Sequence, residues 1–97
     1  LSGPLALKEN EKINDFHVFP NPVLDQLNVS FNLLSPIGNA GVFLVDALGR
    51  ELKTIANGSL NTGHNNFIID LSSYPSGFYF VKIESTERKM TTKFIKN

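Results

Sequence analysis

Short apolar runs, each broken by glycine, proline, asparagine or serine, dominate this chain of 97 residues. From Phe16 onward the runs are roughly four to eight residues long and recur about every 10 to 14 positions. No segment has the apolar period of a helix of three turns. This rhythm favours an all-β sandwich with antiparallel strands. The seven predicted strands are Phe16–Phe19, Gln26–Leu34, Gly41–Asp46, Glu51–Ala56, Asn65–Leu71, Phe78–Glu84 and Met90–Lys96.

One of these runs alternates strictly between apolar and polar residues, as a strand with one buried face does. The apolar positions, which we expect in the core, are Leu27, Val29, Phe31 and Leu33. The polar positions, which we expect to face water, are Asn28, Ser30 and Asn32. A second run repeats the pattern with Phe67, Ile69 and Leu71.

Turn residues separate the runs where a hairpin needs them. Gly49 follows Asp46 by three positions, so the glycine supplies a positive φ and the Asp carboxylate bonds backbone N–H groups of the turn. We therefore predict that Asp46 organises a hairpin turn. Residues 61–66 and 74–77 are predicted to be loops between strands.

Composition limits the functions that such a sandwich can have. Nine Lys and Arg balance nine Asp and Glu, which removes the electrostatic argument for nucleic acid or an anionic membrane as partner. Cysteine is absent, which excludes disulfides and thiolate chemistry. We expect one domain over residues 16–97, a monomer, preceded by a linker or expression remnant over residues 1–15. Without an initiator Met or a signal-peptide pattern, the chain is expected to be an excised piece.

Nothing in the residue pattern predicts an enzyme, a metal site or a cofactor. His17 and His64, the two histidines, have no companion ligand at metal-binding spacing, so we interpret them as surface or turn residues. The serines lie in turns or on polar strand faces without a nucleophile elbow. No spacing brings two carboxylates together as an acid and base pair. The aspartates are Asp15, Asp25, Asp46 and Asp70.

Three consecutive aromatic residues, Phe78, Tyr79 and Phe80, open the sixth predicted strand. They suggest either a ligand platform or core packing. Because side chains alternate along a strand, we favour core packing, with one ring of the three exposed on the outward face.

A series of landmarks, taken in order, resembles a known family. They are Phe19-Pro20-Asn21-Pro22, Leu27-Asn28-Val29, Val45 to Arg50, Leu71 to Tyr79, and Lys93-Phe94-Ile95-Lys96. Over residues 18–97 the chain resembles the type A C-terminal sorting domain of the Bacteroidetes type IX secretion system, also called the Por secretion system. The resemblance implies an immunoglobulin-like sandwich that acts as a signal and directs an upstream cargo from the periplasm across the outer membrane.

The resemblance also implies partners and a fate for the cargo. In the family, a sortase-like cysteine protease of the machinery cleaves before the domain, here within residues 1–15, and the cargo is attached to the cell surface or released. The family's motif positions have structural explanations of their own, in turns, strand starts and packing. Carried over to this sequence, the motif residues are Pro20, Asn21, Pro22, Asp46, Gly49, Gly77, Tyr79 and the terminal lysine, Lys93.

The last predicted strand holds the candidate recognition residues Lys93, Phe94, Ile95 and Lys96. We expect this strand to be at a sheet edge, with both lysines exposed. Such lysines discourage uncontrolled pairing. The alternative is that the strand docks to a translocon component by strand addition, with Lys93 making a charge contact.

Two other functions fit the same fold. A generic immunoglobulin-like or fibronectin-like spacer would show the same strands, because fold alone does not define function. A carbohydrate-binding module would need a flat exposed aromatic platform, whereas most aromatics here are expected to point inward and Trp is absent.

Overall fold

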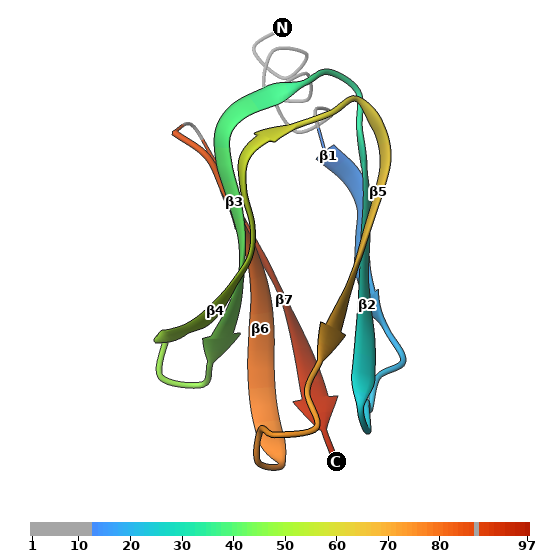
Figure 1. Ribbon diagram of the computed structural model, residues 1–97, viewed down its shortest axis with the longest axis vertical. Helices are drawn as coiled ribbons and strands as arrows, with labels where there is room; N and C mark the ends of the chain where they lie inside the picture. The colour runs from blue at the N-terminus through green and yellow to red at the C-terminus, as the bar shows by residue number, and fades with distance from the viewer. Residues whose placement is uncertain (1–12, 87) are drawn as a thin grey trace, which may run out of the picture.

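The computed structural model describes residues 13–86 and 88–97 of the chain, and these form a β-sandwich (Figure 1). All seven predicted strands are confirmed, most of them longer than expected. Their bounds are β1 (Ile13–Phe19), β2 (Gln26–Leu33), β3 (Ile37–Asp46), β4 (Glu51–Leu60), β5 (Gly63–Asp70), β6 (Gly77–Glu84) and β7 (Lys89–Lys96). No helix in the described ranges is long and apolar enough to cross a membrane.

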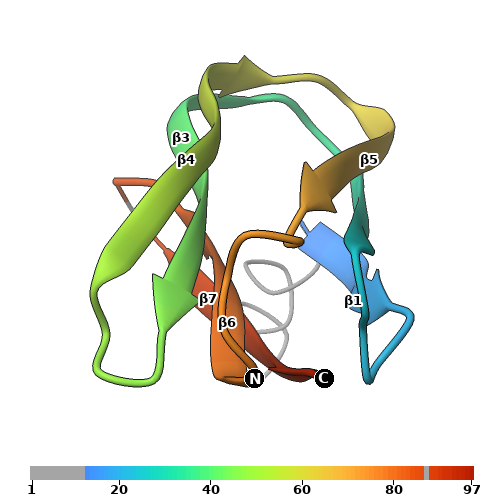
Figure 2. The same ribbon diagram turned by 60° about the horizontal axis from the view of Figure 1, so that its bottom comes forward.

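The strands form two antiparallel sheets. One sheet has the order β1-β2-β5 and the other the order β4-β3-β6-β7. Figure 2 shows the two layers on either side of the interior. The chain passes between the sheets after β2, β4 and β5, as in the Greek-key connections of immunoglobulin-like sandwiches. The predicted fold class is therefore confirmed.

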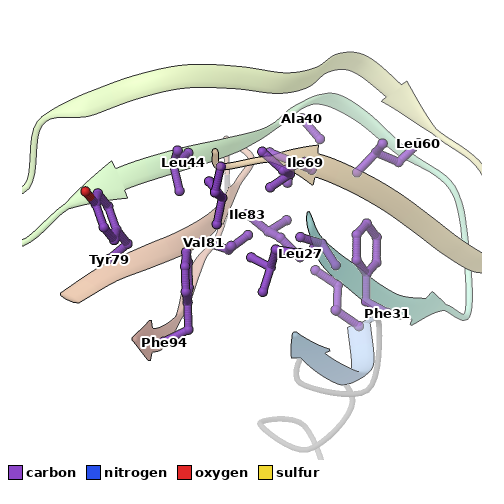
Figure 3. Close-up of a cluster of buried hydrophobic side chains, with 14 of the residues drawn as sticks. Leu27, Phe31, Ala40, Leu44, Leu60, Ile69, Tyr79, Val81, Ile83 and Phe94 are labelled. Carbon is purple, nitrogen blue, oxygen red and sulfur yellow. The ribbon is translucent and has the colours of Figure 1, made fainter. Parts of the chain in front are cut away.

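The core fills the space between the two sheets (Figure 3). All four apolar positions of β2 that were expected inside are buried, from Leu27 to Leu33. Ser30, expected to face water, is instead buried. It lies on the outer face of the central strand of its sheet, opposite His17 of β1 and Asn66 of β5, and these neighbours cover it.

The predicted loop over residues 61–66 is wrong in extent. β4 continues to Leu60 and β5 begins at Gly63, which pairs with Leu33, so only Asn61 and Thr62 connect the two strands. Gly63 has a φ of 104°, which favours glycine. Long-range pairing with β2 and β3 extends both strands beyond their apolar runs.

The first strand begins at Ile13, three positions before its predicted start at Phe16, and Ile13 packs into the core. Its register slips between Asn14 and His17, so the alternation is interrupted where the sequence pattern was weakest. The expected linker over residues 1–15 lies almost wholly outside the described residues.

Candidate recognition surface on the last strand

β7 is an edge strand, paired with β6 on one side only. Its side chains alternate between the two faces of the sheet. Phe94 is fully buried and stacks on Tyr79 across the strand pair, with ring centroids 5.8 Å apart. Lys93 and Ile95 point to the outer face and are exposed.

Lys96 is only 9 % exposed, so the expectation that both lysines of this strand are exposed is wrong. Lys96 shares the inward side of β7 with Phe94, and its cross-strand partner Gly77 has no side chain to compete for that space. Its Nζ donates a hydrogen bond to the backbone oxygen of Asn97 at 2.9 Å. The aliphatic stem is thus buried while the ammonium group has a partner.

The Pro20-Asn21-Pro22 element lies against the end of β7. The backbone N–H of Ile95 donates to Asn21 Oδ1 at 3.0 Å, across 74 positions of sequence. Val23 is fully buried. Its backbone N–H donates to the Ile95 carbonyl, and its own carbonyl accepts the backbone N–H of Asn97, both at 2.9 Å. The start and the end of the domain are therefore hydrogen-bonded to each other.

Further back along β7, the edge backbone is open. The backbone N–H and C=O of Ile95 point away from β6. Along an antiparallel strand this direction alternates from residue to residue, so the backbone groups of Lys93 and Thr91 also point away from β6. Among the described residues, no hydrogen-bond partner meets the backbone of Lys93 or Thr91 on that side. These groups can accept another strand.

The prediction that Asp46 organises a turn is confirmed. Asp46 Oδ1 accepts the backbone N–H groups of Leu48 and Arg50, each at 2.9 Å, and Oδ2 accepts from Arg50 Nε at 2.7 Å. These bonds, the Arg50 N–H first among them, lower the pKa of the Asp46 carboxyl. Gly49 has a φ of 87°, as the tight hairpin requires.

Tyr79 holds the connection between β5 and β6. Its ring is buried, and its hydroxyl donates to the Pro75 carbonyl at 2.5 Å. This is the tyrosine corner of immunoglobulin-like folds, a Tyr near the start of the strand that bonds back to the preceding loop. Gly77, with a φ of 151°, provides the bend between them. The sequence indicated a packing role for Tyr79 and did not identify Pro75 as the partner of its hydroxyl.

Only the middle ring of the three consecutive aromatic residues enters the core. Tyr79 is buried, whereas Phe78 is 50 % exposed and Phe80 is half-buried on the outer face. One ring of the three, Phe78, is exposed on the outward face, as expected, but only Tyr79 packs in the core, because the alternation places both Phe78 and Phe80 on the side away from Tyr79.

Both histidines lie on the outer face of the three-stranded sheet. His64 belongs to β5, not to a loop, and its ring lies 3.5 Å from Ser30 Oγ and 3.4 Å from Asn32 Oδ1. His17 Nδ1 is 2.9 Å from the Asp15 carbonyl. Within residues 13–86 and 88–97, no three His, Cys, Asp or Glu side chains gather where they could hold a metal ion.

Comparison with known proteins agrees with these features. Residues 17–97 match the family profile described as the secretion system C-terminal sorting domain. No curated protein matches the chain. Among solved structures, the chain is similar to PorZ, an essential surface component of the type IX secretion system of Porphyromonas gingivalis, with a TM-score of 0.56 and 18% identity. The match covers 86% of this chain and 11% of PorZ, and at this identity it supports the fold alone.

Proposed function

This chain belongs to the secretion system C-terminal sorting domain family, and on that premise we propose that β7 is the part of it that the secretion machinery binds. A domain of this family is a non-catalytic targeting domain of the type IX, or Por, system and directs the secretion of a cargo. The cargo is a secreted protein that reaches the cell surface or the medium, and the domain interacts with the machinery of the system.

One observation carries the proposal. The backbone N–H and C=O groups of Thr91 and Lys93 point out of an edge strand and have no partner among the described residues. A translocon component that adds a strand here gains ladder hydrogen bonds without disturbing the core. Lys93 places a positive charge beside the incoming strand.

The four candidate recognition residues of β7 have two different roles, according to the face of the sheet on which they lie. Lys93 and Ile95 present their side chains to the partner from the outer face. Phe94 and Lys96 face inward and keep β7 in place on the sheet. Asn21 and Val23 already form hydrogen bonds with the backbone N–H and C=O of Ile95. The added strand therefore pairs only with the part of β7 that precedes Ile95.

The upstream segment has a separate role in the proposal. We place the cut by a sortase-like cysteine protease within residues 1–15, and because β1 already begins at Ile13, we expect it before that residue. The domain travels with its cargo through the periplasm and is removed after it crosses the outer membrane. Surface attachment or release of the cargo follows that cut.

A secretion assay with single proline substitutions tests the role of the β7 edge. Thr91→Pro removes one outward N–H from β7 and retains all its lysines. Asn66→Pro is the matched control, because Asn66 holds the corresponding outward position on β5, the edge of the other sheet. Each variant is fused behind a reporter in a bacterium that carries the type IX system, and circular dichroism of the purified proteins checks folding.

We expect Thr91→Pro to hold the reporter in the periplasm and Asn66→Pro to export it normally, with both proteins folded. Equal export of the two fusions would contradict strand addition at β7. A wild-type fusion that is exported with its upstream segment uncut would contradict only the proposed cleavage.

A further inference from the structure

The outer face of the four-stranded sheet carries a row of hydrophobic side chains that is separate from the core. The row consists of Phe43, Val45, Phe78, Phe80 and Ile95. Val45 pairs with Phe80, and Phe78 pairs with Ile95, so the row continues across three strands. Val45 is only 6 % exposed, yet it packs outside the central cluster. We refer to these five residues as the outer row.

Three lysines accompany the outer row, and two of them have no acidic partner among the residues that the structure describes. Lys82 Nζ lies 2.7 Å from Glu51 and 3.4 Å from Glu84, and it also sits 5.3 Å from the centre of the Phe43 ring. Lys93 Nζ lies over the Phe78 ring at 4.3 Å. In the described part of the chain, no carboxylate approaches Lys89 or Lys93 within 4.0 Å. The face thus has uncompensated positive charge beside hydrophobic surface.

A hollow lies between these lysines and the hairpin turn that follows β3. Val45 and Phe80 line it together with Leu48 of the turn, and Lys89 and Thr91 of β7 line its other side. Leu48 is 79 % exposed, so its side chain is available to a ligand in the hollow. Asp46 and Lys82, whose charges are paired with Arg50 and Glu51, also line it, so the hollow combines hydrophobic side chains with Lys89, which has no acidic partner among the described residues.

We propose that this face binds an extended segment of a partner protein in which a large hydrophobic residue is flanked by acidic residues. The hydrophobic side chain enters the hollow over Val45 and Phe80, and the flanking carboxylates pair with Lys89 and Lys93. Exposed hydrophobic patches with a polar rim are typical of protein interaction sites, and complementary charge gives such contacts their specificity.

Two other occupants fit this face less well. A second copy of the chain would bring the same lysines together across a two-fold axis, and like charges oppose that contact. An anionic membrane would meet Glu51 and Glu84 on the same face, and the chain has no net positive charge. The concave, mixed surface favours a peptide segment.

The inference goes beyond the role proposed for the β7 edge, since it depends on the outer-face side chains of β3 and β6, on Lys89 and on the turn after β3, and not on the backbone groups of β7. A peptide-binding experiment with the whole chain tests it without secretion. The probe is a short synthetic peptide with one central Phe flanked by Asp and Glu. Two comparison peptides carry Lys at the flanking positions or Ser in place of the Phe. Backbone amide shifts locate the site, and fluorescence anisotropy measures affinity at low and high salt.

We expect the acidic peptide to shift the amides of Val45, Phe80 and Thr91, to bind more weakly at high salt, and to bind better than both comparison peptides. The double variant Lys89→Glu, Lys93→Glu should weaken binding about tenfold, while retaining every backbone N–H of β7. Lys53→Glu on β4, outside the hollow, is the control of the same charge change and should bind as the wild type does.

Several outcomes would overturn the inference. They are no binding of the acidic peptide, equal binding of the lysine-flanked peptide, or shifts confined to the three-stranded sheet. A concentration-dependent dimer through the outer row, or binding to vesicles of anionic phospholipid with no peptide binding, would assign the face to one of the other occupants. Because none of these results involves export, the inference and the proposed function can fail separately.

Discussion

The two sheets of the sandwich share one interior but present different outer faces. The three-stranded sheet presents mainly amides, hydroxyls and imidazoles, with Phe19 and Ile68 as exposed hydrophobic side chains, and His64 lies within 3.5 Å of Ser30 Oγ and of Asn32 Oδ1. The four-stranded sheet presents the outer row and its lysines. A sandwich needs only its two inner faces to be hydrophobic. The fold does not require the outer row, and this difference is what draws attention to one sheet as a binding surface.

The largest expected effect tests whether the outer row is a surface or a second core. Phe94→Ala removes a fully buried ring and should lower the free energy of unfolding by about 3 to 5 kcal/mol. Phe78→Ala removes a half-exposed ring from the neighbouring strand and should cost about 1 kcal/mol or less. Urea unfolding measures both. Similar losses would show that the outer row is packed like the core, and the comparison would then be wrong.

A second pair of substitutions compares the two outer faces directly. Val45→Ala should destabilise the protein by about 1.5 kcal/mol, since two buried methyl groups contribute about 0.8 kcal/mol each. Ile68→Ala, on the other sheet, should change stability by no more than about 0.5 kcal/mol because Ile68 is 63 % exposed. Thermal unfolding of the two variants under the same conditions measures the two losses of stability. Equal losses would show that the outer faces of the two sheets do not differ in packing.

A third test concerns how the Phe43 ring is seated. A Cβ added at Gly41 would lie 2.4 Å from the tip of this ring, so Gly41→Ala must displace it at a cost of about 1 kcal/mol. Gly38→Ala in the same strand meets no atom within 4 Å and should be nearly neutral. Adding Phe43→Ala to Gly41→Ala should give less than the sum of the two single losses. Urea unfolding measures the free energy lost in each single variant and in the double variant. If the double loss equals the sum of the two single losses, the ring does not rest on Gly41.

The smallest effect on stability is expected from two aspartates, Asp46 at the end of β3 and Asp70 at the end of β5. The Arg50 N–H lowers the pKa of Asp46, and the Ser72 N–H lowers that of Asp70. A carboxyl with a lowered pKa in the folded state stabilises the protein above its ordinary pKa of 3.8. That stabilisation is lost as pH falls from there through the lowered value.

Asp46→Asn and Asp70→Asn should each remove part of this acid sensitivity in unfolding curves recorded across acidic pH. We expect a larger change for Asp46, which accepts hydrogen bonds from two backbone N–H groups and one side chain, than for Asp70, which accepts the backbone N–H of Ser72. An unchanged pH profile for Asp46→Asn would contradict the role of the carboxylate in the turn.

Local patterns predicted the strands well because alternation and turn chemistry act over a few residues. The inward positions from Leu27 to Leu33 and the Asp46 turn were both confirmed. The errors arose where neighbours distant in sequence decide the outcome. Ser30 is buried by the strands on both sides of it, and Lys96 lies inward opposite a glycine.

The order and spacing of turn and strand residues were sufficient to identify the family, and alternation determined which side chains share a face. Only the tertiary structure decided which sheet each strand joins, that Asn21 and Val23 hold the end of β7, and that Val45 and Phe80 meet on the outer face. The physical reason is that a strand completes its hydrogen bonds with another strand. Edges, partners and outer surfaces therefore depend on long-range pairing, which no local pattern specifies.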